Sequence, residues 1–125
     1  MNSALSTRHP MRNQQVLLHS YPVPAETLWA VLKRALTLLD GVTLKQTDDE
    51  QKVASFQTGM TSTSWGQNMI ASLEPIGGGE VRLLIIGQIR HTFLSSNWGE
   101  SLHNSGFARR LKNFLELALV EIHPD

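Results

Sequence analysis

With 125 residues, of which 41% are hydrophobic and 18% charged, the chain has the size and composition of one ordinary globular domain. Eleven basic residues balance eleven acidic ones, so no overall charge draws the protein towards nucleic acid or an anionic membrane. The lack of cysteine excludes disulfides, thiolate zinc sites and cysteine nucleophiles. Because we find neither an apolar leader nor a run of ~18 apolar residues, we expect a soluble, cytoplasmic protein.

The chain opens with a polar segment and a strand. Residues 1–13 show no periodicity, which predicts a flexible arm ahead of a single domain over 14–125. From Gln14 onward the side chains alternate between two faces until Pro22 interrupts the pattern. This alternation is typical of a β-strand.

An amphipathic helix follows. Pro24 suits its first position, Glu26 suits the positive end of the helix dipole, and Gly41 suits a left-handed cap after its end. Between them an apolar stripe recurs at helical spacing, which predicts one buried face. The stripe consists of Leu28, Trp29, Leu32, Ala35, Leu36 and Leu39.

Four more strands are predicted after this helix. Alternation places them at 42–47, 52–58, 68–74 and 81–89. A polar, acidic turn joins the first two of these strands, and Pro75 with three glycines joins the last two. The last strand is apolar on both faces, which indicates an interior position in a sheet.

Helical spacing of apolar residues returns over about 102–122, after a polar loop over 92–102, and predicts a final helix. The resulting order of elements is β-α-β-β-β-β-α. If the first strand pairs with the last one, the antiparallel sheet has the order 1-5-4-3-2 and both helices cover one face. The predicted class is therefore α+β.

This order, together with the helix entry over 23–29, resembles the helix-on-sheet folds of the TATA-binding-protein-like class, which includes the START and Bet v 1 ligand carriers. The segments 64–68 and 97–99, each with a Trp-Gly pair, look like paired signatures of small uncharacterised bacterial domains. The resemblance implies the fold more than an activity. Since the chain lacks the extra strands and the second early helix of START proteins, the resemblance does not imply a spacious lipid pocket.

The two Trp-Gly pairs suggest a small-ligand site. Trp65 and Trp98 could form an aromatic rim for an apolar ligand held between helices and sheet, with Asn68 and His91 beside them. The alternative is that both tryptophans are large anchors that close the ends of the sheet.

Catalytic and metal-binding patterns are weak. His91 or His103 with Glu100 could act as an acid–base pair only if the fold brought them within hydrogen-bond reach. The histidines lack the short spacing of metal ligands, and no cofactor motif is found, so we predict no catalytic residues, no metal and no cofactor. Arg109 and Arg110 lie on the polar side of the last helix and are interpreted as a solvated face.

The face of the sheet that carries no helix is predicted to be apolar. Alternation assigns to it Leu17, Tyr21, Ile70, Leu84 and Ile86, and exposed apolar patches often mark interfaces. The leading hypothesis is therefore a non-enzymatic binding or protein-interaction module that forms a homodimer through this face. Alternatives are coverage by the N-terminal arm, a small apolar-ligand carrier, or an enzyme using the histidines.

Overall fold

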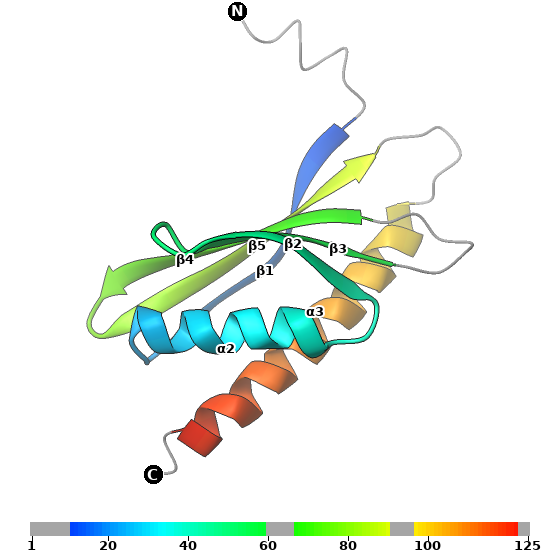
Figure 1. Ribbon diagram of the computed structural model, residues 1–125. Helices are drawn as coiled ribbons and strands as arrows, with labels where there is room; N and C mark the ends of the chain where they lie inside the picture. The colour runs from blue at the N-terminus through cyan, green and yellow to red at the C-terminus, as the bar shows by residue number, and fades with distance from the viewer. Residues whose placement is uncertain (1–10, 60–66, 91–96, 123–125) are drawn as a thin grey trace, which may run out of the picture.

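Five strands and two helices follow one another in the predicted order (Figure 1). The computed structural model describes residues 11–59, 67–90 and 97–122, with side-chain packing described for 14–59, 67–87 and 106–121. The elements are β1 (Met11–Tyr21), α2 (Ala25–Leu38), β2 (Val42–Asp48), β3 (Val53–Thr58), β4 (Gln67–Gly77), β5 (Glu80–Arg90) and α3 (Asn97–Ile122).

The strands form one antiparallel sheet in the order β1-β5-β4-β3-β2, which confirms the predicted topology and the α+β class. β5 lies between β1 and β4, in agreement with its apolar residues on both faces. Both helices lie against the same face of the sheet, and the opposite face carries none (Figure 1). The sheet therefore has an inner face, towards α2 and α3, and an open face.

Two elements begin earlier than their apolar patterns indicate. β1 starts at Met11, because residues 11–13 continue the backbone pairing with the end of β5. α3 starts at Asn97, so Asn97, Trp98 and Gly99 belong to its first turn and not to a preceding loop. In both cases the backbone continues the element beyond the residues whose apolar period predicted it.

The core lies between the inner face and the two helices. The predicted stripe of α2 is confirmed, with Val31 as an additional buried residue and Leu39 only partly buried. Fully burying each such aliphatic side chain stabilises the fold by about 1.5–3 kcal/mol. α3 contributes a row at four-residue spacing that comprises Phe107, Leu111, Leu115 and Leu119.

Leu17 and Tyr21 were assigned to the open face, and this assignment was wrong. Leu17 is 8% exposed and Tyr21 is 3% exposed, and both belong to the core. A register shift lies between Gln15 and Leu17, after which Leu17 pairs with the buried Ile85. Because β1 has apolar residues on both of its faces, alternation alone could not tell which face is inward.

Candidate functional site

Polar residues interrupt the inner face of the sheet at one of its ends. Thr58 continues the inward phase of β3, and Gln67 opens the inward phase of β4. Their backbones are partners in the register, so they lie side by side. On β5 the last inward position whose surroundings are described is Gly87, which is paired with Met69 and with Gln14 of β1. We call Gln14, Thr58, Gln67 and Gly87 the polar inner end.

Gln67 is the residue of the polar inner end whose environment is least usual. Its side chain is buried, with 8% exposed, and its Nε2 atom is inaccessible to solvent and has no hydrogen-bond partner among the residues that the structure describes. The amide lies against the backbone of β5, where a Cβ built on Gly87 would be 3.4 Å from Nε2. That Cβ would also lie 3.2 Å from Val16 Cγ2, so glycine at this position allows both side chains to approach the strand.

Beside the polar inner end, described apolar side chains pack between the helices and the sheet. The rings of Phe56 on β3 and Phe107 on α3 have centroids 5.6 Å apart, and both side chains are buried. Leu111 and Leu115 continue this packing along α3 with no exposed area. Within the described part of the chain, the unpaired amide therefore lies next to a dense apolar core.

Of the four residues predicted to bind a ligand, only Asn68 has a described side chain. Trp65 and His91 lie outside the described residues. Trp98 belongs to the first turn of α3, but its side chain is not among those described. Asn68 is exposed on the open face, where its Oδ1 accepts a hydrogen bond of 2.9 Å from Gln57 Nε2. Asn68 is therefore not part of a site between helices and sheet.

The backbone nevertheless brings the neighbours of these residues in the chain to one end of the sheet. β4 begins at Gln67, two positions after Trp65, and its start pairs with the end of β5, just before His91. Whether Trp65, His91 and Trp98 meet the amide of Gln67 stays a prediction. The proposed pair of His103 with Glu100 lies within α3, where only the backbone is described.

The alternation of inward and outward residues along the strands could have revealed the polar inner end from the sequence. Met69, Ala71 and Leu73 are buried in one phase of β4, and Gln67 holds the next position in that phase. Thr58 replaces an apolar residue in the same way on β3, and Gly87 leaves a position of β5 without a side chain. The two polar interruptions point to a polar patch at one end of the predicted sheet, but only the register shows that they are neighbours.

A second buried polar atom without a partner is the hydroxyl of Tyr21, near the other end of β1. Its ring makes an edge contact with His19, with centroids 4.7 Å apart. Burial raises the pKa of Tyr21 to about 12, and the negative charge of Glu116 contributes to this shift. The hydroxyl therefore stays protonated at neutral pH and can donate a hydrogen bond.

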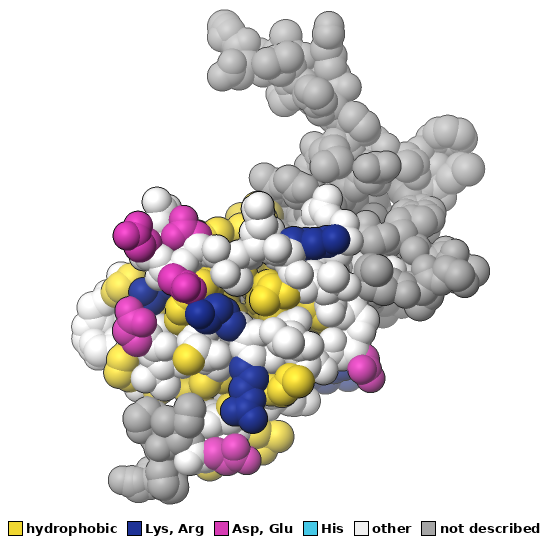
Figure 2. Space-filling view, in the orientation of Figure 1, with side chains coloured by type: hydrophobic (Ala, Val, Ile, Leu, Met, Phe, Trp, Pro, Cys, Tyr) yellow, Lys and Arg dark blue, Asp and Glu magenta, His cyan; other side chains and the backbone are white. Residues whose placement is uncertain are grey.

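The charged side chains that the structure describes are scattered over the surface or tie elements together. Among the residues with described side chains, no three of His, Asp and Glu are close enough together to hold a metal ion. Arg110 Nη1 donates to the backbone oxygen of Asp40 at 3.0 Å, which ties α3 to the segment after α2. Figure 2 shows basic side chains that stand apart from one another and are interspersed with acidic ones.

Neither a protein-family model nor a curated protein matches the sequence. Solved structures do match the fold. The di-domain ARO/CYC BexL from the BE-7585A biosynthetic pathway aligns with a TM-score of 0.64 and 9% identity, over 88% of this chain and 47% of that chain. A START superfamily protein from Mycobacterium smegmatis aligns with a TM-score of 0.60 and 9% identity, over 90% of this chain and 98% of that chain. The chain has a START-like fold.

A third similar structure is the Zhui aromatase/cyclase from Streptomyces sp. R1128, with a TM-score of 0.57 and 12% identity over 90% of this chain and 96% of that chain. The START-like chain thus spans about half the length of the di-domain protein and nearly all of the other two. At these identities the similarity shows the fold, and the resemblance stated from the sequence is confirmed at that level. Within the described part of the START-like chain, no helix is long and apolar enough to cross a membrane.

Proposed function

We propose that the protein binds a small, mainly apolar ligand at the polar inner end, and that Gln67 donates a hydrogen bond from Nε2 to an oxygen of this ligand. The observation that carries the proposal is the buried, unpaired Nε2 atom beside a core that is otherwise apolar. A carbonyl, ether, carboxylate or hydroxyl oxygen would each serve as the acceptor.

The energetic argument rests on the cost of burying an amide. A buried polar group without a partner destabilises a protein by about 1–3 kcal/mol. Met or Leu could fill the position of Gln67 without this cost, since Met69 and Leu73 occupy the same phase of β4. A ligand oxygen that pairs with Nε2 would offset the cost in the bound state and would orient the ligand. Ligand sites commonly combine an apolar lining with a few such polar groups.

A ligand-binding function is compatible with the START-like fold. The similar structures include a START superfamily protein and aromatase/cyclases, whose names describe those proteins and not this one. Trp65 and His91 flank β4 and β5 in the chain, and Trp98 lies in the first turn of α3. These three remain the residues we propose for the rim of the site. The proposal needs no cofactor.

A fluorescence titration with 1-anilinonaphthalene-8-sulfonate tests the proposal, because the probe combines apolar rings with sulfonate oxygens that accept hydrogen bonds. We expect the wild type to bind it saturably. Gln67→Met keeps a side chain of similar length but removes the donor, and should raise the dissociation constant about 5- to 10-fold. Gln57→Met is the matched control on the open face and should change it less than about twofold.

Two outcomes would contradict the proposal. One is that the folded wild type binds the probe only weakly and without saturation. The other is that both methionine variants bind as the wild type does, which would place the probe elsewhere. Solvent extraction of the purified protein, followed by mass spectrometry, would identify a natural ligand that remains bound, and the Gln67→Met variant should retain less of it.

A further inference from the structure

The open face of the sheet has an apolar centre. The register aligns Ile70 of β4 with Ile86 of β5, and Leu84 of β5 with Leu18 of β1. Leu18 is 45% exposed and Ile70 is 40% exposed, which are high values for large aliphatic side chains in the middle of a sheet. Ile70, Leu84 and Ile86 were predicted on this face, and Leu18 takes the place of Leu17 there.

The residues around this centre are mostly polar and uncharged. Among the described side chains that the register places on the open face of β1, β3, β4 and β5, the charged ones are Glu74, Arg82 and, at the start of β5, Glu80. Glu74 and Arg82 form one ion pair, with Arg82 Nη2 3.0 Å from Glu74 Oε1. The other residues of the frame are the apolar Val53 and the polar Gln15, Ser20, Ser55, Gln57, Asn68 and Ser72.

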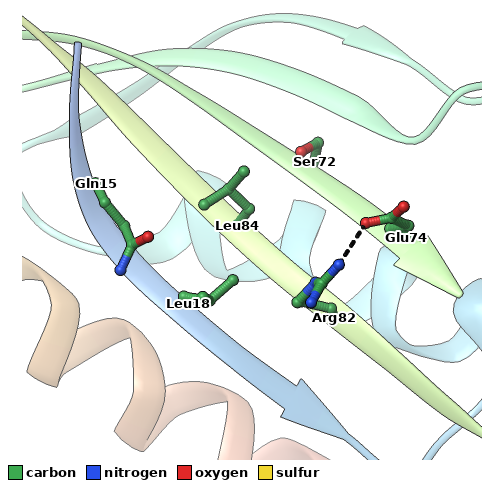
Figure 3. A pocket seen from close by; sticks show the side chains of 6 residues that line it. All are labelled: Gln15, Leu18, Ser72, Glu74, Arg82 and Leu84. Carbon is green, nitrogen blue, oxygen red and sulfur yellow. Dashed lines mark hydrogen bonds and ion pairs between the residues drawn. The ribbon is translucent and has the colours of Figure 1, made fainter. Parts of the chain in front are cut away.

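Such a face differs from an ordinary solvated sheet surface. Charged residues make up 18% of the whole chain, yet the centre of this face has none. Depletion of charge at the centre, with polar groups around it, is the compositional mark of a protein interface. Figure 3 shows the face hollowed around Leu18 and Leu84, with the ion pair at one side. The hollow has a volume of about 260 Å³.

The size of the face agrees with a stable dimer. The sheet has five strands, of six to eleven residues. With about 4.8 Å between strands and about 3.3 Å per residue, it covers about 480–870 Å². Stable complexes bury about 800 Å² on each partner, so an interface would have to use most of the face.

We propose that the open face binds the open face of a second copy of this chain, as two sheets packed face to face about a two-fold axis. The ion pair of Glu74 and Arg82 is electrically self-complementary, because it sets one cation beside one anion on neighbouring strands. A two-fold axis that runs along the strands brings the two ion pairs together, so that Arg82 of each copy lies near Glu74 of the other. The ligand site on the inner face stays free in this arrangement.

Sedimentation equilibrium at tens of micromolar protein tests the proposal. The wild type should be a dimer, and Leu84→Lys should raise its dissociation constant about 100-fold or more, because a lysine in an apolar interface loses hydration without gaining a partner. Leu18→Lys and Ile70→Lys should raise the dissociation constant of the dimer in the same way. They replace Leu84→Lys in the test if that variant fails to fold. Leu117→Lys is the matched control, since Leu117 is 69% exposed on α3, away from the sheet. It should leave the dimer intact.

A charge exchange tests the two-fold arrangement of the ion pairs. Arg82→Glu should weaken the dimer, since four carboxylates then lie close together across the axis. The double variant Glu74→Arg with Arg82→Glu restores opposite charges and should restore the dissociation constant to within about threefold of the wild type. Circular dichroism would confirm that each variant is folded.

Three results would overturn the proposal. A monomeric wild type would do so, and so would a dimer that survives both Leu84→Lys and Leu18→Lys. The third is a chain that is monomeric at full length but dimerises when residues 1–10 are deleted, because the N-terminal segment would then be the occupant of the open face.

Discussion

The turn between β2 and β3 and the polar inner end are both polar regions beside the core, but they differ in how their polar groups are paired. In the turn, Asp49 Oδ1 accepts hydrogen bonds from Trp29 Nε1 at 2.8 Å and from Lys33 Nζ at 2.9 Å. Lys52 Nζ lies 2.9 Å from Glu26 Oε2, and its backbone oxygen accepts from Leu73 N. At the polar inner end, Gln67 Nε2 has no partner.

The paired polar groups of the turn therefore stabilise the fold, whereas the unpaired amide of Gln67 is a candidate for ligand binding. The bonds of the turn join residues of α2, β4 and the turn itself, so they fix the helix on the sheet, and a ligand would have to break them. Hydrogen bonds from Lys33 and then Trp29 lower the pKa of Asp49, which is therefore ionised at neutral pH. The amide of Gln67 contributes nothing comparable to the fold, and a ligand would complete its pairing.

The largest expected effect concerns the packing of α2 on the core, which the bonds of the turn help to fix. Leu32→Ala should lower the free energy of unfolding by about 2–5 kcal/mol, because Leu32 is fully buried on α2 and its truncation leaves a cavity. Leu38→Ala, on the same helix but 58% exposed, is the control and should cost less than about 1 kcal/mol. Equal losses for the two variants in denaturant melts would show that the packed face of α2 is wrongly assigned.

The next largest effect is expected for Gly87→Val, which tests how tightly the side chains at the polar inner end pack against β5. Its Cβ would lie 3.2 Å from Val16 Cγ2 and 3.4 Å from Gln67 Nε2, so overpacking should cost about 1–3 kcal/mol of stability. It should also weaken probe binding. Gly106→Ala is the contrast, since a Cβ at that helical position meets nothing within 4 Å, and should stabilise by about 0.5–1 kcal/mol. A neutral Gly87→Val would mean that this end has room the structure does not show.

Gln67→Met should act in the opposite direction and stabilise the ligand-free protein. Removing a buried, unpaired amide should raise the free energy of unfolding by about 1–2 kcal/mol, although most core substitutions lower it. Guanidinium melts of the variant and the wild type, both extracted free of ligand, would measure the change. Destabilisation by a similar amount would indicate that the amide has a structural partner.

The smallest effect concerns the pH response of the turn. Because the pKa of Asp49 is lowered in the folded state, its favourable interactions are complete above the pKa of an unfolded aspartate, about 3.9, and are lost as the pH falls through the lower folded value. The indole N–H resonance of Trp29 should therefore shift with a midpoint below pH 3.9. Asp49→Asn should abolish this shift. A midpoint at or above the ordinary value would contradict the hydrogen-bonded arrangement.

Most of the fold could be predicted from the sequence, and most of the candidate site could not. The apolar stripe predicted the buried face of α2, and the apolar residues on both faces of β5 predicted its interior position in the sheet. Both could be predicted because the period of apolar residues is a property of the local sequence. The inward face of β1 could not be chosen, since Leu17 and Leu18 are equally apolar and only pairing with Ile85 places Leu17 inside. Gln67 was missed because an amide becomes unusual only when its neighbours leave it without a partner.

The central claim is that Gln67 Nε2 donates to a ligand, and nitrogen–proton NMR of the glutamine side-chain amides tests it most directly. On titration with 1-anilinonaphthalene-8-sulfonate, the account predicts that the Nε2 protons of Gln67 shift progressively and saturate with the same dissociation constant as the fluorescence. The Nε2 proton resonances of Gln57, whose amide is already hydrogen-bonded to Asn68 on the open face, should not shift. If the probe binds saturably while the Gln67 amide does not shift, the polar inner end is not the ligand site.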